Sequence, residues 1–217
     1  MIDFYLIIFF LSLLAFVFFI KLKVATPDQN IIGLMVLVTL PFELYAGYLQ
    51  ANRTNNLFIY HLLVPIQYIF HSFIFYYYIE SNKIKKIILF SIPVVIVTAI
   101  FLTFSIQPIE KYNSYVIVIT SFFTCAWILI YYRQLFIQLT IINIEKEPLF
   151  WISTGLLVYS LGNFFVEGLM KELIEHSMEM AKWYYYNVYM LLLSFLYIMF
   201  IIAFLCRDIF NMNVKKN

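Results

Sequence analysis

Seven long apolar runs, nearly free of charged residues, are the feature that most constrains how this chain can fold. They cover residues 4–20, 31–50, 57–79, 87–106, 115–132, 149–166 and 183–206. Each is about 17 to 25 residues long, the length that crosses about 30 Å of hydrocarbon as an α-helix. Backbone groups in lipid have no water to bind, so runs of this length form helices. The sequence predicts an all-α, polytopic membrane protein, with seven transmembrane helices in one domain, 1–217.

The composition agrees with a bilayer as the main partner of the chain. Hydrophobic residues make up 64% of the 217 residues and charged residues only 12%, far from the averages of soluble domains. The net charge of +2 gives no reason to expect nucleic acid as a partner. The longest stretch between predicted helices, 133–148, is too short for a soluble catalytic domain. Any activity must therefore lie in the bundle or in a separate partner chain.

The distribution of lysine and arginine predicts the orientation, because positive charge is retained on the cytoplasmic side. The N-terminal side and the loops after the second, fourth and sixth runs hold four: Arg53, Lys111, Lys171 and Lys182. The other loops and the tail hold ten: Lys21, Lys23, Lys83, Lys85, Lys86, Arg133, Lys146, Arg207, Lys215 and Lys216. This asymmetry predicts the N-terminus outside and the C-terminus in the cytoplasm. Since Asp3 precedes the first run and lysines follow it, the reverse of a signal peptide, that run is expected to remain as an anchor.

The segment 150–169, "FWISTGLLVYSLGNFFVEGL", carries polar residues on one side of its predicted helix. At 100° per residue, Ser153, Ser160, Asn163 and Glu167 fall within an arc of about 80°. Gly155 and Gly162 lie on the opposite side, where a neighbouring backbone can approach closely. Exposing the polar arc to lipid would be costly. It is therefore expected to face the interior of the bundle.

Other predicted helices carry polar arcs that can face this one. "TLPFELYAGYLQ" places Thr39, Glu43 and Gln50 together, and "NLFIYHLLVPIQYIFHSF" does the same for His61, Gln67, Tyr68 and His71. With the predicted orientation, Glu43, His61, Asn163, Glu167 and Asn187 lie in the outer half, while His71 and Ser153 lie deeper. We therefore expect a polar cavity that opens outward and a polar trail that continues inward. The candidate ligand-binding residues are Glu43, His61, Gln67, His71, Asn163, Glu167 and Asn187.

These residues differ in how strongly they indicate function. Ser, Thr, Asn and Gln often serve as interhelical hydrogen-bonding groups worth about 0.6 kcal/mol each. A carboxylate at a helix centre costs about 2.5 to 3.5 kcal/mol on insertion scales and commonly marks a functional path or a paired site. Glu43 is therefore the strongest candidate. Glu167 lies nearer the membrane surface, where solvation is an alternative explanation.

Several known chemistries do not fit the sequence. A retinal-binding protein needs a lysine in the last helix, and 183–206 has none. His61 and His71 lie about 15 Å apart along one helix, too far to share an ion, and no zinc-ligand spacing is present. No serine-nucleophile motif of the GxSxG type occurs. We expect no metal, no cofactor and no catalytic residue of these kinds, which favours a protein that is not an enzyme.

The residues "PFELY", "NLFIYHLLVPIQY" and "FWISTGLLVYSLGN" resemble a group of short, uncharacterised seven-helix bacterial membrane proteins. The resemblance covers most of the chain and brings no activity with it. It implies membrane parts of bacterial signalling systems whose kinase is a separate chain. The abundance of Ile, Phe, Tyr, Asn and Lys also indicates an AT-rich, bacterial genome, and hence the inner (cytoplasmic) membrane.

The main functional prediction is a membrane-embedded sensory or regulatory module. A small ligand, proton or lipid headgroup would enter from outside and bias the arrangement of the helices, and a separate signalling protein would contact the cytoplasmic ends. The alternatives are a small-solute or proton-coupled transporter and an intramembrane lipid-modifying enzyme that uses Glu43 or Glu167. The segment 168–183 is predicted to be helical. It is either a connector or a lid over the cavity in which Glu175, His176 and Glu179 meet what enters.

Overall fold

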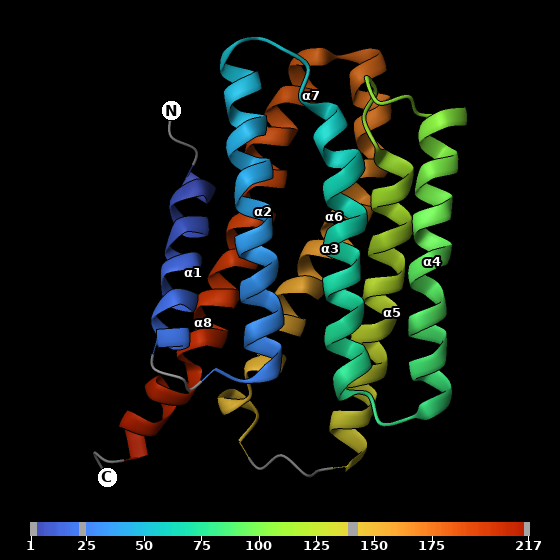
Figure 1. The fold of residues 1–217 in the computed structure, drawn as a ribbon. Coiled ribbons are helices and arrows are strands. Elements are labelled where there is room, and N and C mark those ends of the chain that lie inside the picture. Colours follow the sequence, from blue (N-terminus) through green and yellow to red (C-terminus); the bar gives the residue numbers. More distant parts are fainter. Residues whose placement is uncertain (1–3, 22–24, 139–142, 215–217) are drawn as a thin grey trace.

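The computed structural model describes residues 4–21, 25–138 and 143–214. Every long element in these residues is a helix (Figure 1). The first four are α1 (Phe4–Lys21), α2 (Pro27–Ala51), α3 (Leu57–Tyr78) and α4 (Asn82–Ser105). The next are α5 (Ser114–Gln138), a short 3-10 helix η1 (Ile144–Lys146) and α6 (Pro148–His176). The chain then forms α7 (Met178–Tyr184), the π-helix η2 (Tyr185–Tyr189) and α8 (Met190–Val214).

Six helical stretches are long and apolar enough to cross a membrane. They are Pro27–Ala51, Leu57–Tyr78, Asn82–Ser105, Ser114–Ile137, Pro148–Glu167 and Glu179–Cys206. A shorter apolar stretch, Leu6–Phe18, lies within α1. The all-helical fold predicted from the apolar runs is confirmed, and seven helices fit it. The chain is an integral membrane protein.

Several helices extend beyond the predicted apolar runs. The helix α2 begins at Pro27 and α4 at Asn82, before the apolar runs that start at residues 31 and 87. Pro27 occupies the first turn of α2, and the backbone N–H of Thr26 donates to Oε1 of Gln29 over 2.8 Å, so polar residues form this helix start. The last run was predicted as one helix, whereas the structure interrupts it with the π-helix η2. Hydropathy alone locates the apolar part of a helix and misses its polar ends.

Glycines bring α6 and α8 together. A Cβ at Gly155 would lie 2.7 Å from Cβ of Met199, and one at Gly162 would overlap the Leu192 side chain. The predicted smooth face of α6 is therefore confirmed, and α8 is the helix that packs on it. At the other edge of the bundle, Gly33 of α2 meets the Phe16 ring of α1 in the same way. Small residues allow this close approach in a bundle surrounded by lipid.

The bundle is open between α3 and the α6–α8 pair. α3 packs against α2, α4 and α5, while α6 packs against α5 and α8. Among the described residues, the close helix contacts include none between α3 and α6 or between α3 and α8. Figure 1 shows the connections α2–α3, α4–α5 and α6–α7 together at the end where α1 begins. We call this the loop end and the other the C-terminal end.

Candidate functional site

A cavity of about 510 Å³ fills the space between α3 and the α6–α8 pair. Its walls come from α2, α3, α5, α6, α7, η2 and α8, and from the loops after α2 and α4. Arg53 and Thr54 of the α2–α3 loop and Lys182 of α7 line it at the loop end, and all three are exposed. The predicted interior cavity is therefore present, and it opens at the loop end. Its volume is within the usual range for small-molecule sites.

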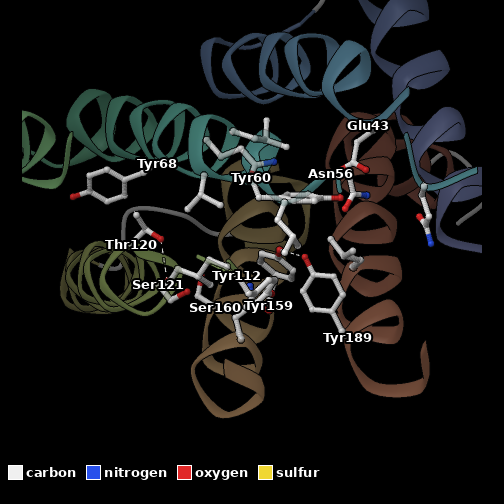
Figure 2. Close-up of a pocket in the computed structure, with 18 of the residues that line it drawn as sticks. Glu43, Asn56, Tyr60, Tyr68, Tyr112, Thr120, Ser121, Tyr159, Ser160 and Tyr189 are labelled. Carbon is white, nitrogen blue, oxygen red and sulfur yellow. Dashed lines mark hydrogen bonds between the residues drawn. The ribbon is translucent and has the colours of Figure 1, made fainter. Parts of the chain in front are cut away.

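Hydroxyl groups and aromatic rings dominate the lining. The hydroxyls of Tyr159 and Tyr189 lie 3.4 Å apart. Figure 2 shows Tyr112, Tyr159 and Tyr189 grouped across the cavity from Tyr60. Such rings offer apolar faces and polar edges in the same wall. The tyrosines that line the cavity are Tyr60, Tyr68, Tyr112, Tyr159, Tyr186, Tyr189 and Tyr197.

An apolar layer forms the floor of the cavity. The deepest lining residue on α3 is His71, and Phe75 follows one turn later. The other helices around the cavity each contribute a side chain to this layer. These side chains are fully buried and belong to one packed cluster: Val36, Phe75, Ile128, Leu156 and Phe200, all 0% exposed. The cavity lining on α3 therefore ends at His71. Buried polar side chains also occur beyond it, among them Ser153, which was predicted to lie deeper.

Four of the predicted site residues line this cavity: Glu43, Gln67, His71 and Asn163. Glu43 is half-buried on α2 and lies beside Asn56 and Tyr60 in Figure 2. Nε2 of Gln67 reaches Oγ1 of Thr39 over 3.5 Å, which links α3 to the polar face of α2. Nε2 of His71 is buried and has no hydrogen-bond partner. The prediction that Glu43 faces the interior is confirmed.

Asn163 and Glu167 lie on the buried side of α6, as predicted, at 3% exposure each. Oδ1 of Asn163 is a buried acceptor without a hydrogen-bond partner. Glu167 does not line the cavity itself. Its Oε1 accepts a hydrogen bond of 2.6 Å from the hydroxyl of Tyr112, which does line it. Glu167 therefore hydrogen-bonds to a tyrosine of the cavity wall without lining the cavity itself.

His61 does not join Glu43 and Asn163, so the predicted convergence of these three side chains was wrong for His61. Its Nε2 lies 3.0 Å from the carbonyl oxygen of Lys111, and its Nδ1 lies 2.9 Å from Oγ1 of Thr103. A carbonyl only accepts, so Nε2 carries the proton and, in the neutral ring, Nδ1 accepts from the Thr103 hydroxyl. His61 thus connects α3 to α4 and to the following loop.

Asn187 also lies outside the cavity lining. It belongs to the π-helix η2, and its Nδ2 donates over 2.7 Å to the carbonyl oxygen of Trp183. The predicted helical character of 168–183 is confirmed, since α6 continues to His176 and α7 follows. α7 reaches the cavity through Ala181 and Lys182, rather than through His176 or Glu179. The side chain of Glu175 lies outside the described residues.

Apart from Tyr68, which was part of a predicted polar arc, the cavity tyrosines are the residues that sequence reasoning missed. A signal was present on α3, where Tyr60, Val64, Gln67 and His71 follow the spacing of one helix face and all line the cavity. Tyr186 lines the cavity and is also 52% exposed. Aromatic residues in membrane helices are ambiguous, because lipid, interface and cavity all accept them.

Comparison with protein-family models, with curated proteins and with solved structures finds no match. Within the part of the chain that the structure describes, no three His, Cys, Asp or Glu side chains are grouped to hold a metal ion. The cavity and its lining are therefore the basis for a functional assignment.

Proposed function

We propose that the protein is a membrane-embedded sensory or regulatory module whose ligand binds in the tyrosine-lined cavity. The observation that carries the proposal is a cavity that opens at the loop end and ends on an apolar floor. A binding site needs one entrance, whereas a transporter must also expose the site to the opposite side. The structure has the single entrance that a binding site needs, and a transporter would require a second arrangement that opens the floor.

The bound ligand has a structural route to the opposite end of the bundle. α8 lines the cavity through Leu193 and Tyr197 and then continues to Val214. α3 lines it from Leu57 to His71 and ends at Tyr78, close to the lysines that begin α4. A ligand that favours one spacing of these helices changes the surface at the C-terminal end. A separate signalling protein that contacts this surface would read the change.

The proposal includes an orientation and a location. The loop end, with Arg53, Lys111 and Lys182, faces the outside, and the C-terminal end faces the cytoplasm. The basic residues described at the C-terminal end are Lys83, Lys85, Lys86, Arg133 and Lys146. This arrangement makes the cavity accessible from outside. The membrane is the bacterial cytoplasmic membrane, in line with the composition of the chain.

Thiol labelling on intact cells tests both parts of the proposal. In a Cys125→Ala, Cys206→Ala background, Ser121→Cys on the cavity wall should react with a membrane-impermeant maleimide added outside. Ser153→Cys, below the floor and 0% exposed, should react from neither side. Reaction of Ser121→Cys from the cytoplasmic side, or of Ser153→Cys from outside, would indicate an open floor and support the transporter.

Two exposed serines at opposite ends of α4 provide matched controls for orientation. Ser105→Cys at the loop end should react only from outside, and Ser81→Cys only from the cytoplasm. The reverse pattern would contradict the orientation without contradicting the cavity.

The binding proposal has its own experiment. Protein purified from its native membrane should yield a small molecule that mass spectrometry detects. Glu43→Gln should lose it, whereas Glu80→Gln, exposed at the C-terminal end, should retain it. Equal yields from both variants would contradict binding at the cavity wall.

A further inference from the structure

Charged residues line the cavity in a definite order from mouth to floor. Among the described lining residues, the two basic ones, Arg53 and Lys182, are exposed at the mouth. The acidic one, Glu43, is half-buried inside. The cavity is therefore positive at its entrance and negative within.

The separation of these charges is set by α2. Glu43 and Gln50 both line the cavity and are seven residues apart, which corresponds to about 10 Å along a helix. Arg53 lies beyond Gln50, since its backbone N–H donates to the Gln50 carbonyl oxygen over 3.0 Å. The α2 backbone therefore separates Glu43 from the Arg53 loop by about 10 Å or more. A ligand that pairs with both ends is elongated, with opposite charges near its two ends.

The surroundings of Glu43 suit an ammonium group. Tyr60 lies beside it and the ring of Tyr189 belongs to the facing group of tyrosines (Figure 2), and aromatic faces attract cations. Asn163 also lines the cavity and is only 3% exposed. Its Oδ1 is a buried acceptor without a hydrogen-bond partner. An unpartnered buried acceptor costs free energy that a ligand N–H group would recover.

We propose that the cavity binds an elongated zwitterion, with its ammonium group at Glu43 and its carboxylate at Arg53 and Lys182. This inference rests on the proposed function and specifies its ligand. Two sources supply such a molecule: a short peptide or a long ω-amino acid. Three extended peptide residues span about 10 Å. Their amide groups would meet the hydroxyls and amides of the wall, and their side chains the apolar residues Leu63, Val64 and Leu193.

Equilibrium dialysis with the full chain in lipid nanodiscs tests the charge order. The probes are a mixed-sequence pool of tripeptides, the same pool N-acetylated, the same pool C-amidated, and 8-aminooctanoate. Free tripeptides should be retained, and acetylation should reduce retention about tenfold or more, as expected for loss of a charge-assisted contact. Amidation should reduce it less, because the exposed cations at the mouth are solvated. Retention of 8-aminooctanoate alone would identify the ω-amino acid as the source.

Variants locate the two ends of the ligand. Glu43→Gln should weaken the free tripeptides about tenfold and leave no further effect of acetylation. The double variant Arg53→Gln, Lys182→Gln should remove the effect of amidation. Glu80→Gln and Lys83→Gln, exposed at the other end, should bind as the unmodified chain does.

Three results would overturn the inference: acetylated and free pools retained equally, a Glu43→Gln variant that binds as well as the unmodified chain, or no retention of either class of probe. A purified small molecule that depends on Glu43 but lacks an ammonium or a carboxylate would overturn the inference alone. It would leave the proposed binding function intact.

Discussion

The two halves of the bundle are made from the same helices, yet they pack in different ways. At the loop end, tyrosine, amide and charged side chains line an open cavity. At the C-terminal end, the same helices bring Val36, Ile128, Leu156 and Phe200 into one fully buried cluster. Each helix thus changes from cavity wall to core within about one or two turns. In lipid, the apolar half holds the helices together by packing, which allows the polar half to stay open.

The comparison predicts that the largest loss of stability follows from a change in the floor. Phe200→Ala removes a fully buried ring and should lower the free energy of unfolding by about 3 to 5 kcal/mol. Unfolding in mixed detergent micelles measures it. The matched control is Phe104→Ala, since Phe104 is 84% exposed on α4 and should change stability little. Equal effects of the two variants would mean that the floor is not a packed core.

A smaller loss should follow from adding one methyl group between α6 and α8. Gly155→Ala places a Cβ 2.7 Å from Cβ of Met199, an atom that cannot move without its helix, so overpacking should cost about 1 to 3 kcal/mol. Gly162→Ala meets the end of the Leu192 side chain, which can change rotamer, and should cost less. Detergent unfolding of the two variants checks the order, and the reverse order would contradict the assigned packing.

At the boundary of the polar half, Tyr112→Phe removes the hydroxyl that donates to buried Glu167. Leaving that carboxyl with one partner fewer should cost about 1 to 2 kcal/mol. Tyr115→Phe, a change at a 44% exposed residue of the same segment, is the control. Adding Tyr112→Phe to Glu167→Gln should cost less than the two separate losses together, because both remove one contact. Strict additivity in the same unfolding assay would show that the contact is not formed.

The smallest effect is expected to be a gain. Gly47 of α2 has open space where a Cβ would stand, and alanine is a better helix former than glycine by about 0.5 to 1 kcal/mol. Gly47→Ala should therefore stabilise the chain slightly, and Gly33→Ala, which would overlap the Phe16 ring, should destabilise it. If Gly47→Ala instead lowered the free energy of unfolding, the new Cβ would have to meet another residue, which contradicts the open space at this position.

The apolar half could be predicted from the sequence better than the polar half. The length of an apolar run predicts a membrane helix, and the spacing of Gly155 and Gly162 predicts a face that a neighbour can approach closely. Both features can be read from the sequence of a single helix. Helical spacing also placed Glu43 and Asn163 inside. It failed for His61, whose partners Thr103 and Lys111 are 42 and 50 residues away. A helical arc tells which residues face inward, but it does not tell which neighbour each one meets.

The π-helix η2 has a consequence for the angular phase of the last helix. Residues on an α-helix succeed one another by about 100° and 1.5 Å, and a π turn accommodates an extra residue. η2 follows α7 and carries Tyr186 and Tyr189, and α8 below it carries Phe200 in the floor. The phase that brings Tyr186 and Tyr189 to the cavity therefore does not have to equal the phase that buries Phe200. Because of this one irregular turn, the angle at which η2 faces the cavity and the angle at which α8 faces the floor are set separately.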